Sequence, residues 1–381
     1  MAPVYCSLRK IAFAAGVVAA ASGPALAQEP AADSALKLTG FMSVVGGRVL
    51  GSNLGADYTG SPTIAGQQCP CYVADWHNAG VYDHSFALDQ ESRAGIQAKY
   101  TVSRDLNLVA QIVIRATDFK PSVQWAYAAY AVDRNWEVQF GRKRIPLYFY
   151  SDFQDVGAAY PWVSTPPELY GWEAANYNGA SVRYKNAIGD TNVTASMFAG
   201  GETVQDSKYY KLLSTGATKI RWRNLVGGDV ELSNGPLTVR GVYMQANINS
   251  ANPAIGLDDH AHLKAYGIAA NLDFDSWFVL SELTQQTRDF DGYRITTPAA
   301  TVGAGYRFGA WTPFVNVAKY TERTSDSAAY QPISWTRSAL TLRYDLDARS
   351  SFKAQVDHHK DRTRNFGDTV NVVRLAYDRL F

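Results

Sequence analysis

The sequence predicts an all-β fold, a closed transmembrane antiparallel β-barrel of about 16 strands. Three observations support this prediction. From residue 36 onward, segments of about ten residues alternate apolar and polar side chains, which is the period of a β-strand. Residues that favour turns separate these segments, and short connections alternate with long ones. Aromatic residues, which make up 13% of the chain, gather where the segments meet the short connections.

The composition argues against two other classes of protein. The chain of 381 residues has 36 Lys and Arg residues against 35 Asp and Glu residues, whereas a nucleic-acid-binding protein usually carries a strong basic excess. No apolar stretch approaches the roughly 18 residues that a membrane-spanning helix needs. A soluble protein of this length would have two domains, but a single large barrel is equally compatible with it.

Residues 1–27 are predicted to be a secretory signal peptide. Two basic residues precede an apolar run over residues 11–21, and residues 25–27 (Ala-Leu-Ala) supply the small side chains of a cleavage site. A buried helix is the alternative, but the Gly-Pro pair at residues 23–24 would break it. We therefore expect an exported protein in which residues 28–35 lead into the barrel at 36–381.

Two cysteines, Cys69 and Cys71, remain after the signal peptide, with one proline between them. This spacing closes too small a ring for an ordinary unstrained disulfide. Two thiolates are also too few for a metal site without further ligands. We expect a local feature of a loop, with a strained disulfide as one possibility and no bound metal.

Sixteen strands follow from the alternating segments. They are predicted to begin near residues 36, 91, 106, 124, 135, 178, 191, 222, 237, 263, 277, 298, 312, 335, 350 and 369. Seven connections are tight and rich in Gly, Asn, Asp and Pro. The longer ones are predicted at residues 51–80, 118–123, 143–176, 201–221, 248–262, 288–297, 323–334 and 361–368. Because every long connection follows an odd-numbered strand, all long loops should lie at the outer end and all short turns at the periplasmic end.

One face of each strand is apolar, as a lipid-facing surface requires. In residues 106–115 the even positions are all apolar, whereas Asn107, Gln111 and Arg115 occupy odd positions. A soluble β-sandwich could show the same alternation. The aromatic residues at the strand ends are therefore the second observation needed to predict a membrane barrel. Aromatic girdles at both interfaces are typical of outer-membrane barrels. The ends are marked by Tyr100, Trp136, Tyr184, Phe274, Trp277, Phe308, Trp311, Tyr344, Phe352 and Tyr377, and the chain itself ends on Phe381.

The most distinctive stretch is residues 138–171. Val-Gln-Phe-Gly-Arg at residues 138–142 ends a strand and opens into the third long loop, which contains Ser-Asp-Phe-Gln-Asp at 151–155 and Pro-Pro-Glu-Leu-Tyr-Gly at 166–171. This stretch resembles the Gram-negative porins of the sixteen-stranded, trimeric kind, and the resemblance extends over the mature chain. The loop lacks the Pro-Glu-Phe-Gly-Gly-Asp run of the enterobacterial form.

The resemblance implies several properties of the assembled protein. It implies a homotrimer in the outer membrane, in contact with outer-membrane lipid. It also implies a first long loop, residues 51–80, that latches onto a neighbouring subunit. The third loop, at about residues 143–176, should fold into the lumen and narrow it.

Strand parity predicts a basic wall inside the barrel, because inward and outward side chains alternate. The predicted wall residues are Arg93, Arg115, Arg142, Arg183, Lys185, Arg240, Arg337, Arg343, Lys353 and Arg374. Inward acids are fewer: Glu137, Glu282, Asp357 and Asp378.

The third loop has the opposite charge. Its acids are Asp152, Asp155, Glu168 and Glu173, and residues 147–177 contain no Lys or Arg. If the loop folds inward, these acids should face the basic wall across a constriction, where opposed charges order water and select ions. The alternative is that inward Arg residues pair with neighbouring acids while the loop acids are solvated.

The predicted function is passive diffusion of ions and small hydrophilic solutes through a water-filled channel, because sixteen strands enclose an aqueous lumen. A channel selective for anionic or sugar-like solutes is the near alternative, and an adhesin or structural barrel is a third class. A barrel-embedded hydrolase is a further alternative, although no nucleophile elbow, metalloprotease or phosphate-binding motif occurs.

Two groups of residues contain side chains of the types used in catalysis or metal binding. Asp357, His358 and His359 lie near the loop end of the fifteenth strand, where a catalytic triad could sit, but a solvated rim is the preferred interpretation. The His and Asp residues at 258–262 could hold a metal, but we place them in a flexible loop. We therefore expect no catalytic residues, cofactor or metal.

Overall fold

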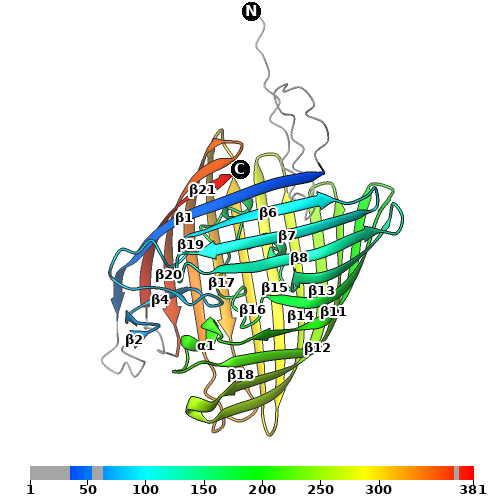
Figure 1. Cartoon of the computed structure of the whole chain (residues 1–381). Helices are drawn as coiled ribbons and strands as arrows, with labels where there is room; N and C mark the ends of the chain where they lie inside the picture. Colours follow the sequence, from blue (N-terminus) through cyan, green and yellow to red (C-terminus); the bar gives the residue numbers. More distant parts are fainter. Residues whose placement is uncertain (1–34, 54–62, 364–368) are drawn as a thin grey trace, which may run out of the picture.

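Sixteen long strands close into one antiparallel barrel in the computed structural model, which describes residues 35–53, 63–363 and 369–381 (Figure 1). The strands are β1 (Leu36–Asn53), β6 (Arg93–Thr101), β7 (Leu106–Arg115), β8 (Pro121–Ala131), β9 (Trp136–Arg144), β10 (Asn176–Ile188), β11 (Thr191–Val204), β12 (Lys219–Asn234), β13 (Leu237–Asn252), β14 (Leu257–Asp273), β15 (Trp277–Phe290), β16 (Arg294–Tyr306), β17 (Trp311–Thr321), β19 (Ser334–Asp347), β20 (Ser350–Asp361) and β21 (Thr369–Leu380). The two-residue β18 (Arg323–Thr324) extends β17 and pairs with β16. The predicted all-β barrel is confirmed.

The barrel closes where its first and last strands meet. β1 pairs with β21 along one edge and with β6 along the other. Gly40 and the terminal Phe381 exchange two backbone hydrogen bonds, of 3.2 and 2.9 Å. Closure satisfies the backbone polar groups that an open edge would leave unpaired in hydrocarbon.

Inward and outward side chains alternate along the strands as predicted. In β21, Arg374 and Ala376 are buried inside the barrel, whereas Leu375 between them is 52% exposed on the outside. Aromatic residues pair on the outside near the turns, and the Trp136 and Tyr184 rings are 4.8 Å apart. None of the helices in the described residues is long and apolar enough to cross a membrane.

Short turns and long loops lie at opposite ends, as Figure 1 shows with the chain terminus among the turns and β2, β4 and α1 at the far end. The first loop contains β2 (Thr63–Ile64), β3 (Gln67–Gln68), β4 (Tyr72–Asp75) and β5 (Gly80–Tyr82). The other short elements are α1 (Lys208–Lys211) and the 3-10 turns η1 (Ser151–Phe153), η2 (Gly157–Ala159) and η3 (Pro253–Ile255). The predicted signal peptide and lead-in, apart from residue 35, lie outside the described residues, as do residues 54–62 and 364–368 of two predicted loops.

Two predicted long loops are wrong. Residues 248–262 and 288–297 are mostly strand, and the connections shrink to residues 253–256 and 291–293. The strands continue past the apolar band because their polar residues keep pairing, for example Asn249 with His260. His260 and His262 therefore lie in β14 rather than in a flexible loop.

The inner wall is not polar all round. Over β12–β17 many inward side chains are apolar and buried, including Trp222, Met244, Leu263 and Phe314. They pack against aromatic residues of the third loop, residues 145–175, which lies inside the barrel. This loop and the apolar wall form a core like that of a soluble protein, which the alternation of the strands did not predict.

Candidate functional site

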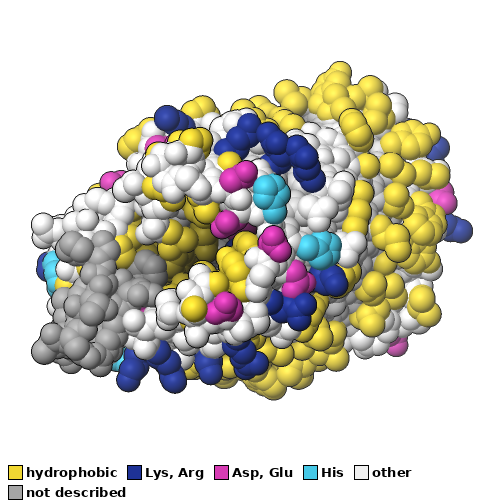
Figure 2. Space-filling model, turned by 90° about the horizontal axis from the view of Figure 1, so that it is seen from below, with side chains coloured by type: hydrophobic (Ala, Val, Ile, Leu, Met, Phe, Trp, Pro, Cys, Tyr) yellow, Lys and Arg dark blue, Asp and Glu magenta, His cyan; other side chains and the backbone are white. Residues whose placement is uncertain are grey.

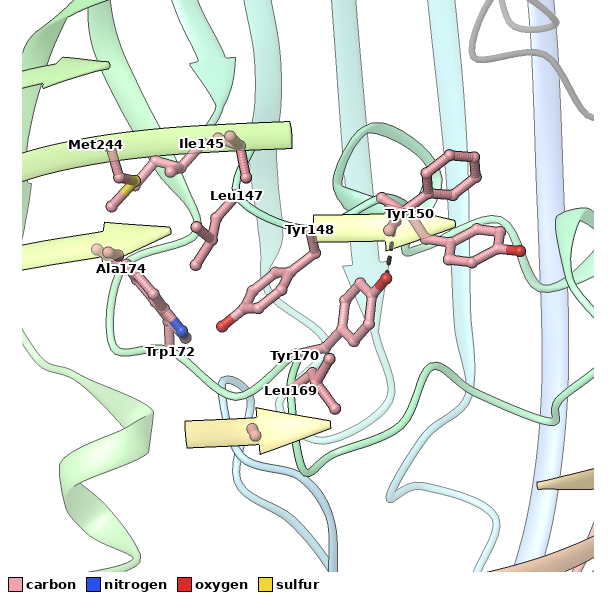
Figure 3. Close-up of a cluster of buried hydrophobic side chains, with 14 of the residues drawn as sticks. Ile145, Leu147, Tyr148, Tyr150, Leu169, Tyr170, Trp172, Ala174 and Met244 are labelled. Atoms are coloured by element: carbon pink, nitrogen blue, oxygen red, sulfur yellow. Dashed lines mark hydrogen bonds between the residues drawn. The ribbon is translucent and has the colours of Figure 1, made fainter. Parts of the chain in front are cut away.

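The third loop is the main structure inside the lumen, and an aromatic cluster fixes its first half. Tyr148, Tyr170 and Trp172 pack with Leu147 and Met244 (Figure 3). The Tyr148 and Tyr170 ring centres are 4.6 Å apart. Packing of this kind excludes water, so this side of the lumen is filled by protein.

Glu282 of β15 holds the same cluster to the wall. Its carboxylate accepts hydrogen bonds from the Phe149 backbone N–H at 2.9 Å and from the Tyr170 hydroxyl at 2.6 Å. The Tyr170 hydroxyl in turn accepts a hydrogen bond from the Tyr150 N–H at 3.2 Å, drawn in Figure 3. A buried carboxylate needs such donors, and here the loop supplies them.

Asp155 is bound by three arginines of the wall. Its carboxylate pairs with Arg115 at 2.5 Å and with Arg144, and its carbonyl accepts a hydrogen bond from Arg93 at 2.8 Å. Burial alone would raise the pKa of Asp155, but Arg115 and Arg144 outweigh it and hold that pKa well below its usual value. Asp155 is therefore ionised at neutral pH, and it anchors the loop.

Glu168 is the last member of a series of buried side-chain charges that alternate in sign. Arg337 donates to Glu168 at 3.0 Å and to Asp357 at 2.9 Å. Arg374 then joins Asp357, at 2.9 Å, to Glu91, at 2.8 Å. Each charge in this series has an opposite neighbour, which is the condition for burying ionised groups.

Other wall cations bind the loop through its backbone. Lys353 donates to the carbonyls of Gly157 and Trp162 at 2.6 and 2.7 Å. Arg343 reaches the carbonyls of Ala158 and Tyr160 in the same way. Arg240 donates to the Pro146 and Tyr148 carbonyls at 2.6 and 2.8 Å.

Glu173, the last acid of the loop, pairs with Arg288 at 2.8 Å. Arg288 was not among the predicted wall residues, although it lies in β15 and its charge could have signalled it. Asp155, Glu168 and Glu173 thus contact cations directly, instead of facing them across water as we expected. The basic wall mainly serves to hold the loop.

Arg142 was wrongly assigned to the wall. It lies two residues after the outward Phe140, which is 72% exposed, and it pairs across the sheet with the exposed Asn178. Its guanidinium binds Glu202. Because side chains alternate, the adjacent Lys143 is the inward cation, and its ammonium group lies over the Tyr127 ring, 5.5 Å from the ring centre.

Asp152 differs from the other three loop acids. Within the described part of the chain, its carboxylate forms no hydrogen bond or ion pair. It lies in η1, is half-buried, and interacts electrostatically with Lys143, Tyr127 and Tyr177. It therefore lies beside the part of the wall on β8–β10 that the loop leaves uncovered, and it also interacts with Arg144 and Arg240.

This uncovered wall belongs to β8–β12. Its charged inward side chains include Arg183 and Lys185, as predicted, and all of them keep some exposure. The others are Glu137, Lys143, Asp229 and Glu231. Asp152 and this mixed set of charges border the polar side of the lumen.

The described part of the first loop after residue 62 folds into the mouth of its own barrel. The latch to a neighbour that we expected for residues 51–80 stays a prediction. Trp76 stacks on Trp335 of β19 with ring centres 5.1 Å apart, and it also contacts Tyr209 of α1. His77 bonds the Trp172 carbonyl through Nδ1 at 2.6 Å, and burial lowers the pKa of His77. Figure 2, which views the loop end, shows a recess there.

Two smaller predictions concern the cysteines and the rim. Cys69 and Cys71 form a disulfide within the first loop. Asp357 and His359 point into the barrel, whereas His358 points outward and bonds Asn371 at 2.8 Å. These three residues therefore do not converge on one site.

The comparisons with known proteins agree with this architecture. The family model of the Gram-negative porins matches residues 14–364. The chain belongs to the Gram-negative porin family. No curated protein sequence matches it.

Solved structures of outer-membrane channels share the fold of this porin. The channel DcaP of Acinetobacter baumannii aligns with a TM-score of 0.59 and 13% identity, over 91% of this chain and 97% of that one. The anion-selective porin of Comamonas acidovorans gives 0.57 and 15%, over 91% and 99%. OmpT of Vibrio cholerae, in its trimer form, gives 0.56 and 11%, over 91% and 99%.

The family and the closed barrel together establish the general function. This porin is an outer-membrane channel for the passive diffusion of solutes. Its lumen has a filled side, where the third loop rests on apolar wall, and a polar side along β8–β12.

Proposed function

We propose that ions and small hydrophilic solutes cross this porin along the polar side of the lumen, between Asp152 and the β8–β12 wall. One observation carries the proposal: Asp152 is the loop acid whose carboxylate has no ion-pair partner within the described residues. A charge that is already paired contributes little field, whereas an unpaired carboxylate near Lys143 acts on passing ions. No catalytic step is part of the proposal.

The test is ion current through the purified mature protein in a planar lipid bilayer with a salt gradient. The substitution Asp152→Asn should move the reversal potential toward that of an anion-selective channel, because the pathway loses a negative charge. Asp206→Asn is the matched control, since Asp206 is an exposed loop acid that pairs with Lys211. An unchanged reversal potential in Asp152→Asn, with normal conductance, would contradict the proposed pathway.

The same recording distinguishes the alternative of a channel selective for anionic or sugar-like solutes. The uncovered wall carries Lys143, Arg183 and Lys185, and the similar Comamonas structure is described as anion-selective. A wild-type reversal potential near that of a perfect anion channel would favour this alternative. Block of the current by added sugars would favour a sugar pathway.

We also propose that the protein is cleaved after residue 27 and assembles as a homotrimer. The OmpT structure in its trimer form and the family membership support the assembly. Each insertion into the bilayer should then raise the conductance by three equal single-channel units. The mass of the purified protein gives its first residue, and a mass that includes residues 1–27 would contradict the cleavage.

A further inference from the structure

The outer surface of β12–β14 carries basic residues directly above the lipid-facing band. On β12, Ile220 and Trp222 point inward and are almost fully buried. Alternation therefore turns Lys219, Arg221 and Arg223 outward. Three cations on one face of one strand repel one another unless an anion lies beside them.

The neighbouring strands extend this face sideways. On β14, Leu263 and Ala265 are buried inside the barrel, so His262 and Lys264 point outward. On β13 between them, Asn247 and Asn249 are the outward residues, because Ala246 and Ile248 are buried. We call this surface the basic face, made up of Lys219, Arg221, Arg223, Asn247, Asn249, His260, His262 and Lys264.

The register brings these residues into rows across the sheet. Arg223 lies opposite Asn247, which lies opposite His262. Arg221 is joined to His260 through Asn249 in the next row. Because neighbouring strands are about 4.8 Å apart, each row is about 10 Å wide.

The cations of the basic face are not neutralised by the protein. Within the described residues, Lys219, Arg221, Arg223 and Lys264 form no ion pair. Two acids border the face without pairing with these four cations: Asp258 accepts a hydrogen bond from Asn249, and Asp289, opposite His262, pairs with Arg294. The outward Arg142, by contrast, pairs with Glu202.

The position of the basic face identifies its partner. Below it on the same strands lie Val226, Tyr243, Tyr266 and Ile268, each at least 41% exposed on the apolar outer surface. Figure 2 shows basic side chains at the rim of the loop end, with acidic and His side chains among them and apolar side chains outside. Cations at the boundary between hydrocarbon and water attract anionic lipid headgroups.

We propose that the basic face binds the phosphates of an anionic lipid headgroup in the leaflet at the loop end. Arg221 and Arg223 supply planar donors suited to phosphate, and Lys264 supplies a point charge. The lipid chains lie along Tyr243, Tyr266 and Ile268. This site is on the outside of the barrel and is independent of what passes through the lumen.

The test measures binding of diphosphoryl lipid A to the purified mature porin in nonionic detergent. The double variant Arg221→Gln with Arg223→Gln should bind about twenty-five-fold more weakly, since each basic residue near an anionic surface contributes about fivefold. The variant Arg221→Lys with Arg223→Lys should recover most of the binding. Arg104→Gln with Arg134→Gln removes the same charge at the turn end and should bind normally.

Three results would overturn the proposal. Equal binding of lipid A without its phosphates would show that the phosphates are not recognised. Complete competition by millimolar inorganic phosphate would show an ion site rather than a lipid site. Loss of oligomers in the Gln double variant, with lipid binding unchanged, would assign the basic face to contact between protein copies. Migration of the unheated barrel on a gel checks that each variant is folded.

Discussion

Adjacent residues in this porin can have entirely different surroundings. Arg142 lies on the outside with Glu202, whereas Lys143 lies in the lumen over Tyr127. One step along a strand moves a side chain from one face of the sheet to the other. The functional importance of a cation here therefore depends on its parity more than on its chemistry.

Lys143→Gln should shift the reversal potential toward that of a cation-selective channel, because the pathway loses a positive charge beside Asp152. Arg142→Gln is the matched variant and should leave the reversal potential unchanged. Measuring both in the same salt gradient tests the assignment. Equal shifts in the two variants would contradict it.

The stabilisation that Asp155 gives to the third loop should depend on pH in the acid range. Because the pKa of Asp155 is lowered on folding, its stabilisation is present above the ordinary pKa of about 3.9 and declines as pH falls toward the folded value. Asp155→Asn should cost about 3 kcal/mol at neutral pH, since it breaks a buried ion pair. Thermal unfolding of both proteins should show this difference shrinking below about pH 4. A difference that stays constant down to pH 2 would contradict the anchoring role.

At the scale of residues, part of the site could be predicted from the sequence. Alternation correctly turned Arg93, Arg115 and Arg374 inward, because a period of two fixes the face. It did not reveal their partners, because the path of the third loop is not periodic. Lys353 contacts two backbone carbonyls of the loop, and the residue types of the loop do not indicate these contacts.

At the scale of elements, two loops meet inside the barrel. The first loop contributes Trp76 and His77, and the third loop contributes Trp172. Trp76 also reaches Tyr209 in the loop after β11. Segments from three parts of the chain thus meet at the mouth, where Trp76 and Tyr209 pack in one cluster with Trp335.

Trp76→Ala should widen the mouth and raise single-channel conductance, because it removes the ring that stacks on Trp335. It should also lower stability by about 3 kcal/mol, as expected for truncating a buried Trp. Trp136→Ala is the control, since Trp136 is 45% exposed at the turn end. Conductance that rises equally in both variants would argue against a specific role of the mouth.

Strands were easier to predict than loops for a physical reason. Alternation marks a strand only while one face meets lipid, so the predicted strands stopped near the end of the apolar band. β13 and β14 continue beyond it, where Asn247 and His262 are outward and polar. Such residues look like loop residues in a sequence, although backbone pairing persists.

The whole molecule was predictable because closure is a global requirement. An even number of strands with alternating connections returns the chain to its start, and β1 and β21 pair accordingly. The uneven filling of the lumen was not predictable. It depends on where an internal loop rests, which no single strand encodes.

The apolar wall under the third loop has a consequence for how this porin tolerates substitution. Inward positions of β12–β17 such as Met244 and Ala265 should accept other apolar residues of similar volume and reject charges. Inward positions along β8–β11 such as Tyr127 and Arg183 should accept many polar residues. A library of random substitutions, selected for export and folding, would read out this difference around the circumference. One barrel would then show the substitution profile of a globular interior on one side and of a hydrated surface on the other.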